Sequence, residues 1–456
     1  MSKLEAETGC DKLNNMQFPG KTALVAACFL SASASSPARP NLILISVDTL
    51  RQDHLSVYGY HRQTTANIDR LLESGVRFNN AHCNVPLTNP SFASLYTSAY
   101  PHDTGATRNG VPMVKSAETL AEILKRNGYS TAAFLSNWPL KARISNLDKG
   151  FDLYDDNFFK KRWVFFNNER GAKQVTELAN RWLDSRPREP FFLWAHYSDP
   201  HAPYLLHRGF AFPSPKGPRS EAQDRADAYD SEVAYTDHYI GELLDKIKAL
   251  GMDRHSLIVF TADHGEELGE HGYIGHGRHV YEPSMRIPFG VSGPGIPSGV
   301  KVDAQVELLD LAPTMLAYAS LPRAKAMKGR NILPYVQGLK SWPARFLIYY
   351  ETYPGAVRVE AAEKLVDINR PSWIGLKIDD LKVSCHLSGS RWEMYNLQAD
   401  PGENKNLAEP TKGVFIEFSN LLMAWYKGWR SSAVAGRTDA MSEEDRKRLE
   451  SLGYFK

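Results

Sequence analysis

Three short apolar runs constrain the fold of this chain more than any other feature. Each is a continuous stretch of β-prone residues, which is typical of a strand buried on both faces of a sheet. They span residues 41–47, 190–196 and 256–261. Helical patterns lie around and between them, at residues 65–74, 119–126, 174–182 and 226–250. Strands that alternate with helices predict an α/β fold with a mostly parallel sheet sandwiched by helices.

The pattern changes after about residue 340. Three β-prone segments follow one another without long helices, at residues 344–353, 375–386 and 391–397, and residues 415–429 then form an apolar helix. We therefore predict a main domain over residues 40–340 and a C-terminal α+β subdomain over residues 341–456, with a small antiparallel sheet and a helix.

The N-terminus has the pattern of an exported protein. Lys21 precedes a short apolar run and the small residues Ala32-Ser33-Ala34, as in a secretory signal peptide. The run is too short for a stable membrane anchor. We predict that residues 1–39 are a signal peptide and flexible N-terminus, that the protein is periplasmic or secreted, and that the mature chain has no transmembrane segment. A disordered extension is the alternative, and Cys28 ends a stretch that resembles a lipoprotein box.

Charge and cysteine content exclude several classes of protein. The net charge is +2 over 456 residues, which gives no electrostatic case for binding nucleic acid. Only Cys83 and Cys385 would remain after signal cleavage, and two thiols make no disulfide framework. We expect both to be buried and unreactive.

Polar residues follow each of the three apolar runs. Asp48 follows the first, Asp199 and His201 the second, and Asp263 and His264 the third. Ligands of open α/β sheets bind at the carboxyl ends of the strands, so we expect these side chains to meet. Asp48, Asp263 and His264 offer two carboxylates and an imidazole, which suit one or two divalent ions of Mn, Zn, Ca or Mg. Any one such aspartate by itself is more often a helix N-cap.

Two further groups of polar residues are weaker metal candidates. The glycine-rich loop after Asp263 carries His271, His276 and His279. We interpret His271 and His279 as surface histidines. The helix over residues 226–250 carries Asp230 and Asp237, for which a solvated or capping face is the better interpretation than a metal site.

Several ordered blocks resemble the sulfatase family of the alkaline phosphatase superfamily, from about residue 40 to residue 409. They are PNLILISVDTLRQDHLSVYGY, PSFASLYTSAYPHDTG, HYSDPHAPY, TADHGEELGEHG and MYNLQADPGENKNLA. The resemblance implies an alkaline-phosphatase-like fold and a metal-dependent ester hydrolase.

The resemblance also places Thr88 at the nucleophile position. Sulfatases typically carry Cys-x-Pro-Ser-Arg, whose cysteine is oxidised to formylglycine, and Thr88 to Phe92 stand there in this chain. Cys83 is followed by Asn84-Val85-Pro86 and does not supply the motif. We therefore expect no formylglycine, and a threonine-nucleophile subgroup in which Thr88 is both nucleophile and metal ligand. Pro90 favours a helix that begins at or just after Thr88, whose alternative role is a simple N-cap.

A threonine ester changes the chemistry. It cannot release sulfate by collapsing to an aldehyde, so water must attack the sulfur or phosphorus directly. We therefore favour phosphate diesters, phosphate monoesters or phosphonate esters of a small molecule, glycan or lipid. The alternative is an arylsulfatase-type sulfuric ester hydrolase. An alternative of another class is a degenerate, non-catalytic binding protein.

The family pattern suggests further site residues and shows departures. By resemblance, His201 contacts the transferred group or the leaving oxygen, His276 and Asn109 bind substrate, and His201 or His276 protonates the leaving group. Thr49 replaces a usual aspartate and Gly277 a usual lysine, so the site is less basic than in a sulfatase. Arg51 adds charge near the site or forms an ion pair with Asp53.

Overall fold

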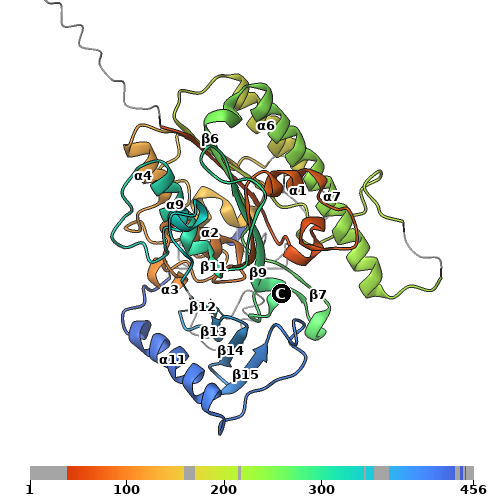
Figure 1. Cartoon of the computed structure of the whole chain (residues 1–456), viewed down its shortest axis with the longest axis vertical. Helices are drawn as coiled ribbons and strands as arrows, with labels where there is room; N and C mark the ends of the chain where they lie inside the picture. The colour runs from red at the N-terminus through yellow and green to blue at the C-terminus, as the bar shows by residue number, and fades with distance from the viewer. Residues whose placement is uncertain are drawn as a thin grey trace, which may run out of the picture. The chain divides into compact units, whose positions relative to one another are not determined.

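The fold of the computed structural model is built on a large central sheet (Figure 1). Its strand order is β10-β2-β9-β6-β1-β5-β3-β4, with β11 also pairing with β2. Its strands are β1 Asn41–Val47, β2 Val76–His82, β3 Ser130–Phe134, β4 Leu153–Asp155, β5 Phe191–Tyr197, β6 Ser256–Ala262, β9 Arg286–Ser292, β10 Val300–Val302 and β11 Val306–Glu307. Only β9 is antiparallel to its neighbours within the described part of this sheet. The predicted mostly parallel sheet is confirmed.

The structure describes residues 39–158, 170–213, 217–343, 346–353, 369–436, 442–444 and 447, within one compact unit of residues 39–456. The signal sequence predicted within residues 1–39 and the lipoprotein-like Cys28 lie outside the described residues, apart from Arg39. Across the described ranges, no helix is both long enough and apolar enough to cross a membrane.

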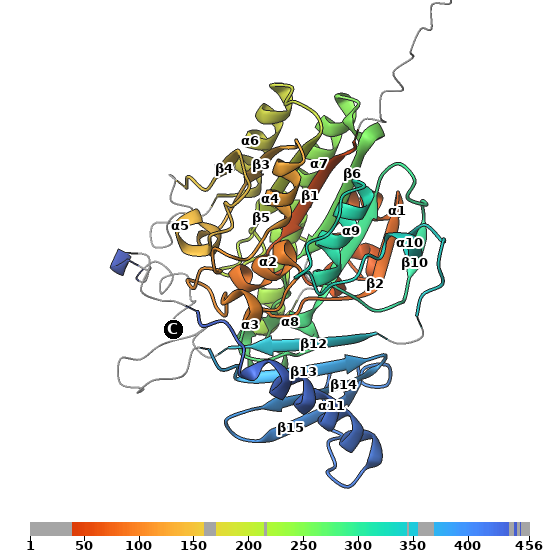
Figure 2. The same cartoon turned by 90° about the vertical axis from the view of Figure 1, so that its left-hand side faces the viewer.

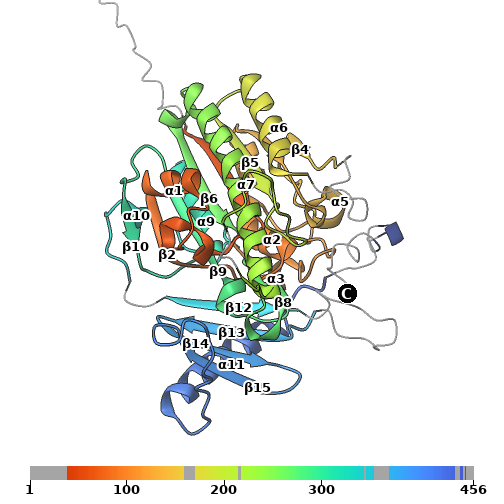
Figure 3. The ribbon, with the colours of Figure 1, turned by 90° about the vertical axis from the view of Figure 1, so that its right-hand side faces the viewer.

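Helices cover both faces of the sheet. Figure 2 shows α2, α4 and α9 in front of the sheet, and Figure 3 shows α1, α6 and α7 on the opposite face. The described helices are α1 Ala66–Glu73, α2 Thr88–Thr97, α3 Pro101–Thr104, α4 Leu120–Arg126, α5 Ala142–Ser145, α6 Ala172–Asp184, α7 Glu221–Ala249, α8 Glu282–Met285, α9 Leu311–Tyr318, α10 Leu333–Val336 and α11 Gly413–Arg430. Helix α7 begins earlier than expected because Ser220 and Gln223 form a capping box at its start.

The three central strands determine where the predicted functional residues lie. Every residue of β1, β5 and β6 is buried, as the apolar runs predict. Val47 lies opposite Tyr197 on one side and Ala262 on the other. Because the three strands are parallel, the residues that follow them emerge at one edge of the sheet.

Strands β2 and β9 do not follow from the hydrophobic pattern. Asn79 and Asn80 interrupt β2 and are half-buried. The register with β9 shifts between Phe78 and Ala81. A bulge of this kind breaks the alternation by which strands are recognised in a sequence.

The C-terminal segment forms the predicted antiparallel sheet. Its order is β12-β13-β14-β15, with β12 Leu347–Thr352, β13 Trp373–Ile378, β14 Leu381–His386 and β15 Arg391–Asn396. Helix α11 packs on it through Phe418 and Leu422. Ile348 and Tyr350 of β12 belong instead to the main core. The boundary at residues 340/341 therefore marks a change of architecture and, as a domain boundary, stays a prediction.

A buried cation ties this small sheet to the main unit. Lys382 of β14 lies 3.1 Å from Glu282 of α8 and 2.9 Å from Glu403, and its side chain is 2% exposed. Removal of one partner from a buried ion cluster leaves uncompensated charge.

We expect Lys382→Met to reduce the free energy of unfolding by about 3–5 kcal/mol in denaturant titrations, because two buried carboxylates would lose their cation. Lys412→Met is the control, since Lys412 pairs with Glu409 on the surface and is 55% exposed. That change should be under about 1 kcal/mol. Equal effects of the two substitutions would contradict the role given to Lys382.

Candidate active site

Two carboxylates and an imidazole meet at the carboxyl ends of β1 and β6. Asp48, Asp263 and His264 are each fully buried, and one ligand atom from each lies within 4.8 Å of the others. His264 Nε2 is 3.6 Å from Asp48 Oδ1 and 3.4 Å from Asp263 Oδ2. The structure thus brings the three predicted metal ligands together.

His264 is held in the form that binds metals. Its Nδ1 is 2.9 Å from the carbonyl oxygen of Gly265, so Nδ1 carries the proton and donates it. Burial lowers the pKa of His264 well below its usual value, which keeps the ring neutral. The lone pair of Nε2 then faces the two carboxylates, as a second-shell carbonyl commonly arranges in metal sites.

The donor set fits a divalent cation. Asp263 Oδ2 is buried and accepts no hydrogen bond from the described residues. Burial raises the pKa of Asp263 to about 7, since its charged form lacks solvation. A cation beside it would offset that penalty, and two carboxylates with an imidazole suit the predicted metals.

Asn137 is a residue that the sequence argument missed. Its side-chain amide donates to Asp48 Oδ2 and so orients that carboxylate. It lies in the block Leu135–Trp138, where the family pattern has a lysine-containing motif. The family comparison of that block was the signal that could have found it.

Thr88 is the first residue of α2, beside the three ligands. Its Oγ1 lies 3.5 Å from His264 Nε2, and Leu87 is the helix N-cap. Ser91 in the first turn donates to the carbonyl oxygen of Asp263 at 2.7 Å, which ties the helix to the end of β6. The predicted helix start is confirmed, and a simple N-cap role for Thr88 is excluded.

Asn109 lies at the same helix end. Its Oδ1 accepts the backbone N–H of Asn89 at 2.8 Å. Its Nδ2 is buried and has no hydrogen-bond partner among the described residues. This leaves one amide donor next to Thr88.

His276 and His201 line up beyond His264. The ring centroids of His264 and His276 are 4.5 Å apart, and those of His276 and His201 are 5.2 Å apart. In His276, Nδ1 lies 3.1 Å from Glu266 Oε1, and in His201, Nδ1 lies 2.8 Å from the carbonyl oxygen of Ala202. Glu266 is fully buried and was also missed, because a glutamate in a glycine-rich loop usually faces water.

His271 and His279 are engaged elsewhere. His271 contacts Glu267 and the carbonyl oxygen of Gly402, and its ring stacks on Tyr281. His279 is half-buried and lies 5.3 Å from the same tyrosine ring. The interpretation of His271 as a satisfied surface histidine is confirmed.

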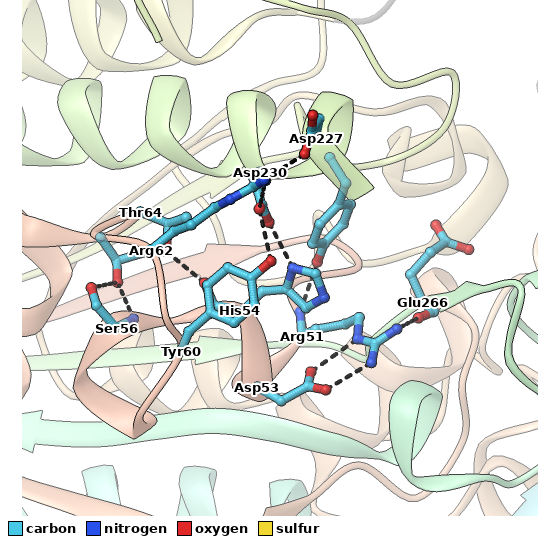
Figure 4. A network of polar contacts seen from close by, with 12 residues as sticks. Arg51, Asp53, His54, Ser56, Tyr60, Arg62, Thr64, Asp227, Asp230 and Glu266 are labelled. Carbon is cyan, nitrogen blue, oxygen red and sulfur yellow. Dashed lines mark hydrogen bonds and ion pairs between the residues drawn. The ribbon is translucent and has the colours of Figure 1, made fainter. Parts of the chain in front are cut away.

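A polar network behind the site fixes the loop after Asp48 (Figure 4). Arg51 pairs with Asp53 at 2.7 Å and with Glu270 at 2.6 Å, so the predicted structural ion pair is present. The Tyr229 hydroxyl accepts the N–H of Arg51 at 2.9 Å and donates to the carbonyl oxygen of Thr49 at 2.7 Å. These contacts hold the backbone on which Asp48 depends.

The two aspartates of α7 have structural roles. Asp237 accepts the backbone N–H groups of Asn67 and Ile68 and caps α1. Asp230 is fully buried and pairs with Arg62 and His54 (Figure 4). The expectation of a capping residue is confirmed for Asp237, and that of a solvated face is wrong for Asp230, because partners on the loop after β1 enclose it.

Three residues that depart from the family pattern are Phe92, Thr49 and Gly277, and the structure shows the surroundings or backbone conformation of each. Phe92 is fully buried, with its ring centroid 4.9 Å from those of Trp194 and His196. Thr49 has φ 56°, a left-handed conformation that is strained for a β-branched residue. Gly277 has φ 84°, which a lysine would adopt only with strain.

We expect Asp263→Asn to weaken divalent metal binding about tenfold or more, because a charged ligand is lost. Elemental analysis after dialysis, followed by metal titration, measures this. Asp303→Asn, at an exposed residue that contacts Asn79, is the control and should retain metal. Stoichiometric metal in the Asp263 variant would contradict the assignment.

Gly265→Ala tests how closely the ligand loop must pack. A Cβ there would lie 2.0 Å from the carbonyl oxygen of Pro283, so the backbone must shift. We expect a loss of about 1–3 kcal/mol in the free energy of unfolding, together with weaker metal binding.

Gly413→Ala is the matched control, because a Cβ at this helix start meets nothing within 4 Å. It should be neutral or stabilising by up to about 1 kcal/mol. Metal binding by the Gly265 variant equal to that of the parent would show that the loop tolerates the shift.

Comparison with known proteins agrees with this geometry. The family model described as Sulfatase matches residues 40–321, and the one described as N-sulphoglucosamine sulphohydrolase, C-terminal, matches residues 269–419. N-acetylglucosamine-6-O-sulfatase of Bacteroides thetaiotaomicron is 24% identical over 87% of this chain and 88% of its own length.

Two solved structures share the fold. One, in complex with its substrate D-glucosamine-2-N,6-O-disulfate, has a TM-score of 0.70 and 21% identity, over 86% of this chain and 98% of that chain. The phosphonate monoester hydrolase of Agrobacterium radiobacter has a TM-score of 0.67 and 19% identity, over 86% of this chain and 95% of that chain. From the family match over most of the main domain, the chain belongs to the sulfatase family and is a hydrolase of ester bonds.

Proposed function

We propose that this sulfatase-family hydrolase is metal-dependent and uses Thr88 as its covalent nucleophile. The observation that carries the proposal is the position of Thr88 Oγ1, 3.5 Å from His264 Nε2 and beside two buried carboxylates. The proposed substrates are phosphate diesters, phosphate monoesters or phosphonate esters.

The location of Thr88 favours a reactive hydroxyl. It is fully buried at the first position of α2, where backbone N–H groups and the helix dipole favour negative charge. The divalent metal that sulfatase-family enzymes bind would be held by Asp48, Asp263 and His264, and would supply positive charge that stabilises an ionised hydroxyl and the transferred group.

The cysteine content supports a mechanism without formylglycine. Cys83 is buried, and its thiol lies 3.6 Å from the carbonyl oxygen of Ser284. Burial raises the pKa of Cys83 well above its usual value. Cys385 lies on β14 in the small sheet. Thr88, and neither of these thiols, stands beside His264.

The reaction would proceed by two displacements. Thr88 attacks in line, an Oγ1–P bond forms, and the bond from phosphorus to the leaving oxygen breaks. His201 or His276 donates a proton to that leaving oxygen. The Nδ2 of Asn109 binds an oxygen of the transferred group. Water then attacks phosphorus and gives a proton to the histidine that lost one in the first step. The Oγ1–P bond breaks, and Thr88 is released in its ionised form.

The second candidate is hydrolysis of sulfate esters. It is favoured by the relatives, since N-acetylglucosamine-6-O-sulfatase and the structure bound to a glucosamine disulfate both act on or hold sulfated sugars. Phosphorus is favoured by the threonine, which cannot release sulfate by C–O cleavage, and by the shared fold of the phosphonate monoester hydrolase.

We expect Thr88→Ala to lower kcat about a thousandfold or more, as loss of a nucleophile does. The assay compares p-nitrophenyl phosphate, bis-p-nitrophenyl phosphate, a phenylphosphonate ester and p-nitrophenyl sulfate, with metal content measured on each preparation. Thr88→Ser, which keeps a hydroxyl, should retain measurable turnover.

Thr97→Ala is the control, since Thr97 lies at the other end of α2 and bonds only the carbonyl oxygen of Ala93. Full turnover by the metal-loaded Thr88→Ala variant would overturn the assignment of Thr88 as the nucleophile. Turnover of the sulfate ester above the phosphorus esters would select the second candidate.

A further inference from the structure

Arg108 is a buried arginine with no charged partner among the residues that the structure describes. It is 5% exposed, and its Nε and Nη1 are buried with no hydrogen-bond partner among the described residues. Burial lowers the pKa of Arg108, and no neighbouring carboxylate offsets that effect. A buried guanidinium is normally paired, because its desolvation is strongly unfavourable.

Two other buried arginines follow that rule, whereas Arg77, which is 7% exposed, donates to the carbonyl oxygen of Val57 and lies over the Tyr58 ring. Arg51 pairs with Asp53 and Glu270, and Arg170 pairs with Asp155 at 2.8 Å. Arg170 has the same 5% exposure as Arg108. Among the described residues, Arg108 thus has neither the carboxylate partner of Arg51 and Arg170 nor the carbonyl acceptor of Arg77.

The backbone of Arg108 lies in a turn that contacts the N-terminal end of α2. Its carbonyl oxygen accepts the N–H of Val111 at 3.1 Å and lies 3.5 Å from Asn89 Nδ2. The next residue, Asn109, accepts the N–H of Asn89. Arg108 is thus fixed one residue from Asn109 and against the first turn of the helix that begins with Thr88.

Two positions of this site at which the family pattern has a cationic side chain carry none here. Gly277 stands where the family pattern has a lysine, and Phe92 of α2 is packed in the core. A tetrahedral anion with two or three charged oxygens needs positive charge, and a guanidinium fork matches such oxygens in a bidentate way.

We infer that Arg108 is the anion-binding cation of this site and holds the oxygens of the sulfate- or phosphate-type group that is transferred. The inference rests on the proposed ester-hydrolase site but not on Thr88 as nucleophile, and it holds for sulfur and phosphorus alike.

Anion binding by the metal-loaded protein tests this directly. The probes are inorganic phosphate and inorganic sulfate, measured by calorimetry and by the rise in Tm that each anion produces. We expect Arg108→Gln to weaken binding of both about 10- to 100-fold, the loss of one or two charge-assisted hydrogen bonds. The anion affinity of Arg108→Lys, which keeps the positive charge but not the planar guanidinium, should lie between that of the parent protein and that of Arg108→Gln.

Stability without anion separates this role from a structural one. Arg108→Gln removes an unpaired buried charge, so Tm without phosphate or sulfate should stay the same or rise. Arg170→Gln, the matched control at equal burial, should lower Tm by breaking its ion pair and leave anion binding intact. A lowered Tm together with parental anion affinity in Arg108→Gln would overturn the inference.

Different measurements test the Thr88 proposal and the Arg108 inference, so the failure of one can be distinguished from the failure of the other. Thr88→Ala should lose turnover and keep anion binding, whereas Arg108→Gln should lose anion binding. If Thr88→Ala turns over normally, the nucleophile is wrong, yet the anion measurement still decides the role of Arg108. Parental affinity for both anions in the Arg108→Gln and Arg108→Lys variants overturns the inference even where Thr88 is the nucleophile.

Discussion

The site depends on the enforced proximity of two buried carboxylates. Parallel pairing of β1 with β6 puts Asp48 and Asp263 at one edge of the sheet, and both are fully buried. Asn137 donates to Asp48, and the backbone N–H groups of Thr49 and His264 approach Asp263 Oδ1 at 3.4 and 3.0 Å. Asp263 Oδ2 accepts no hydrogen bond from the described residues, and a divalent cation held there would offset the cost of burying its charge.

The surrounding structure keeps this arrangement in place. Thr49 is held in a strained left-handed conformation, and the Tyr229 hydroxyl bonds its carbonyl oxygen. Gly265 passes so close to Pro283 that a Cβ would not fit. Strain and close packing at these two points fix the ligand backbone on both strands, so the donors are positioned before any substrate binds.

The sequence predicts those parts of the site that follow from periodicity and strand ends. Asp48, Asp263 and His264 each follow an apolar run, so their meeting point could be inferred. Arg108 could not, because arginines in loops are usually exposed and burial is a tertiary property. Strands β2 and β9 were hidden for a related reason, since the bulge next to Asn79 removes the regular alternation.

The departure at Phe92 changes which groups the start of α2 can offer to an anion. The Phe92 ring fills a space between Trp194 and His196, where a guanidinium would be buried among rings. With position 92 apolar, α2 presents a hydroxyl and backbone N–H groups at its start but no cation of its own. Under the inference above, the turn at Arg108 provides that charge from the adjacent segment. The positive charge then comes from the turn next to the helix and not from the helix itself. The transferred group would be held from a different side than in a protein with arginine at that helix position.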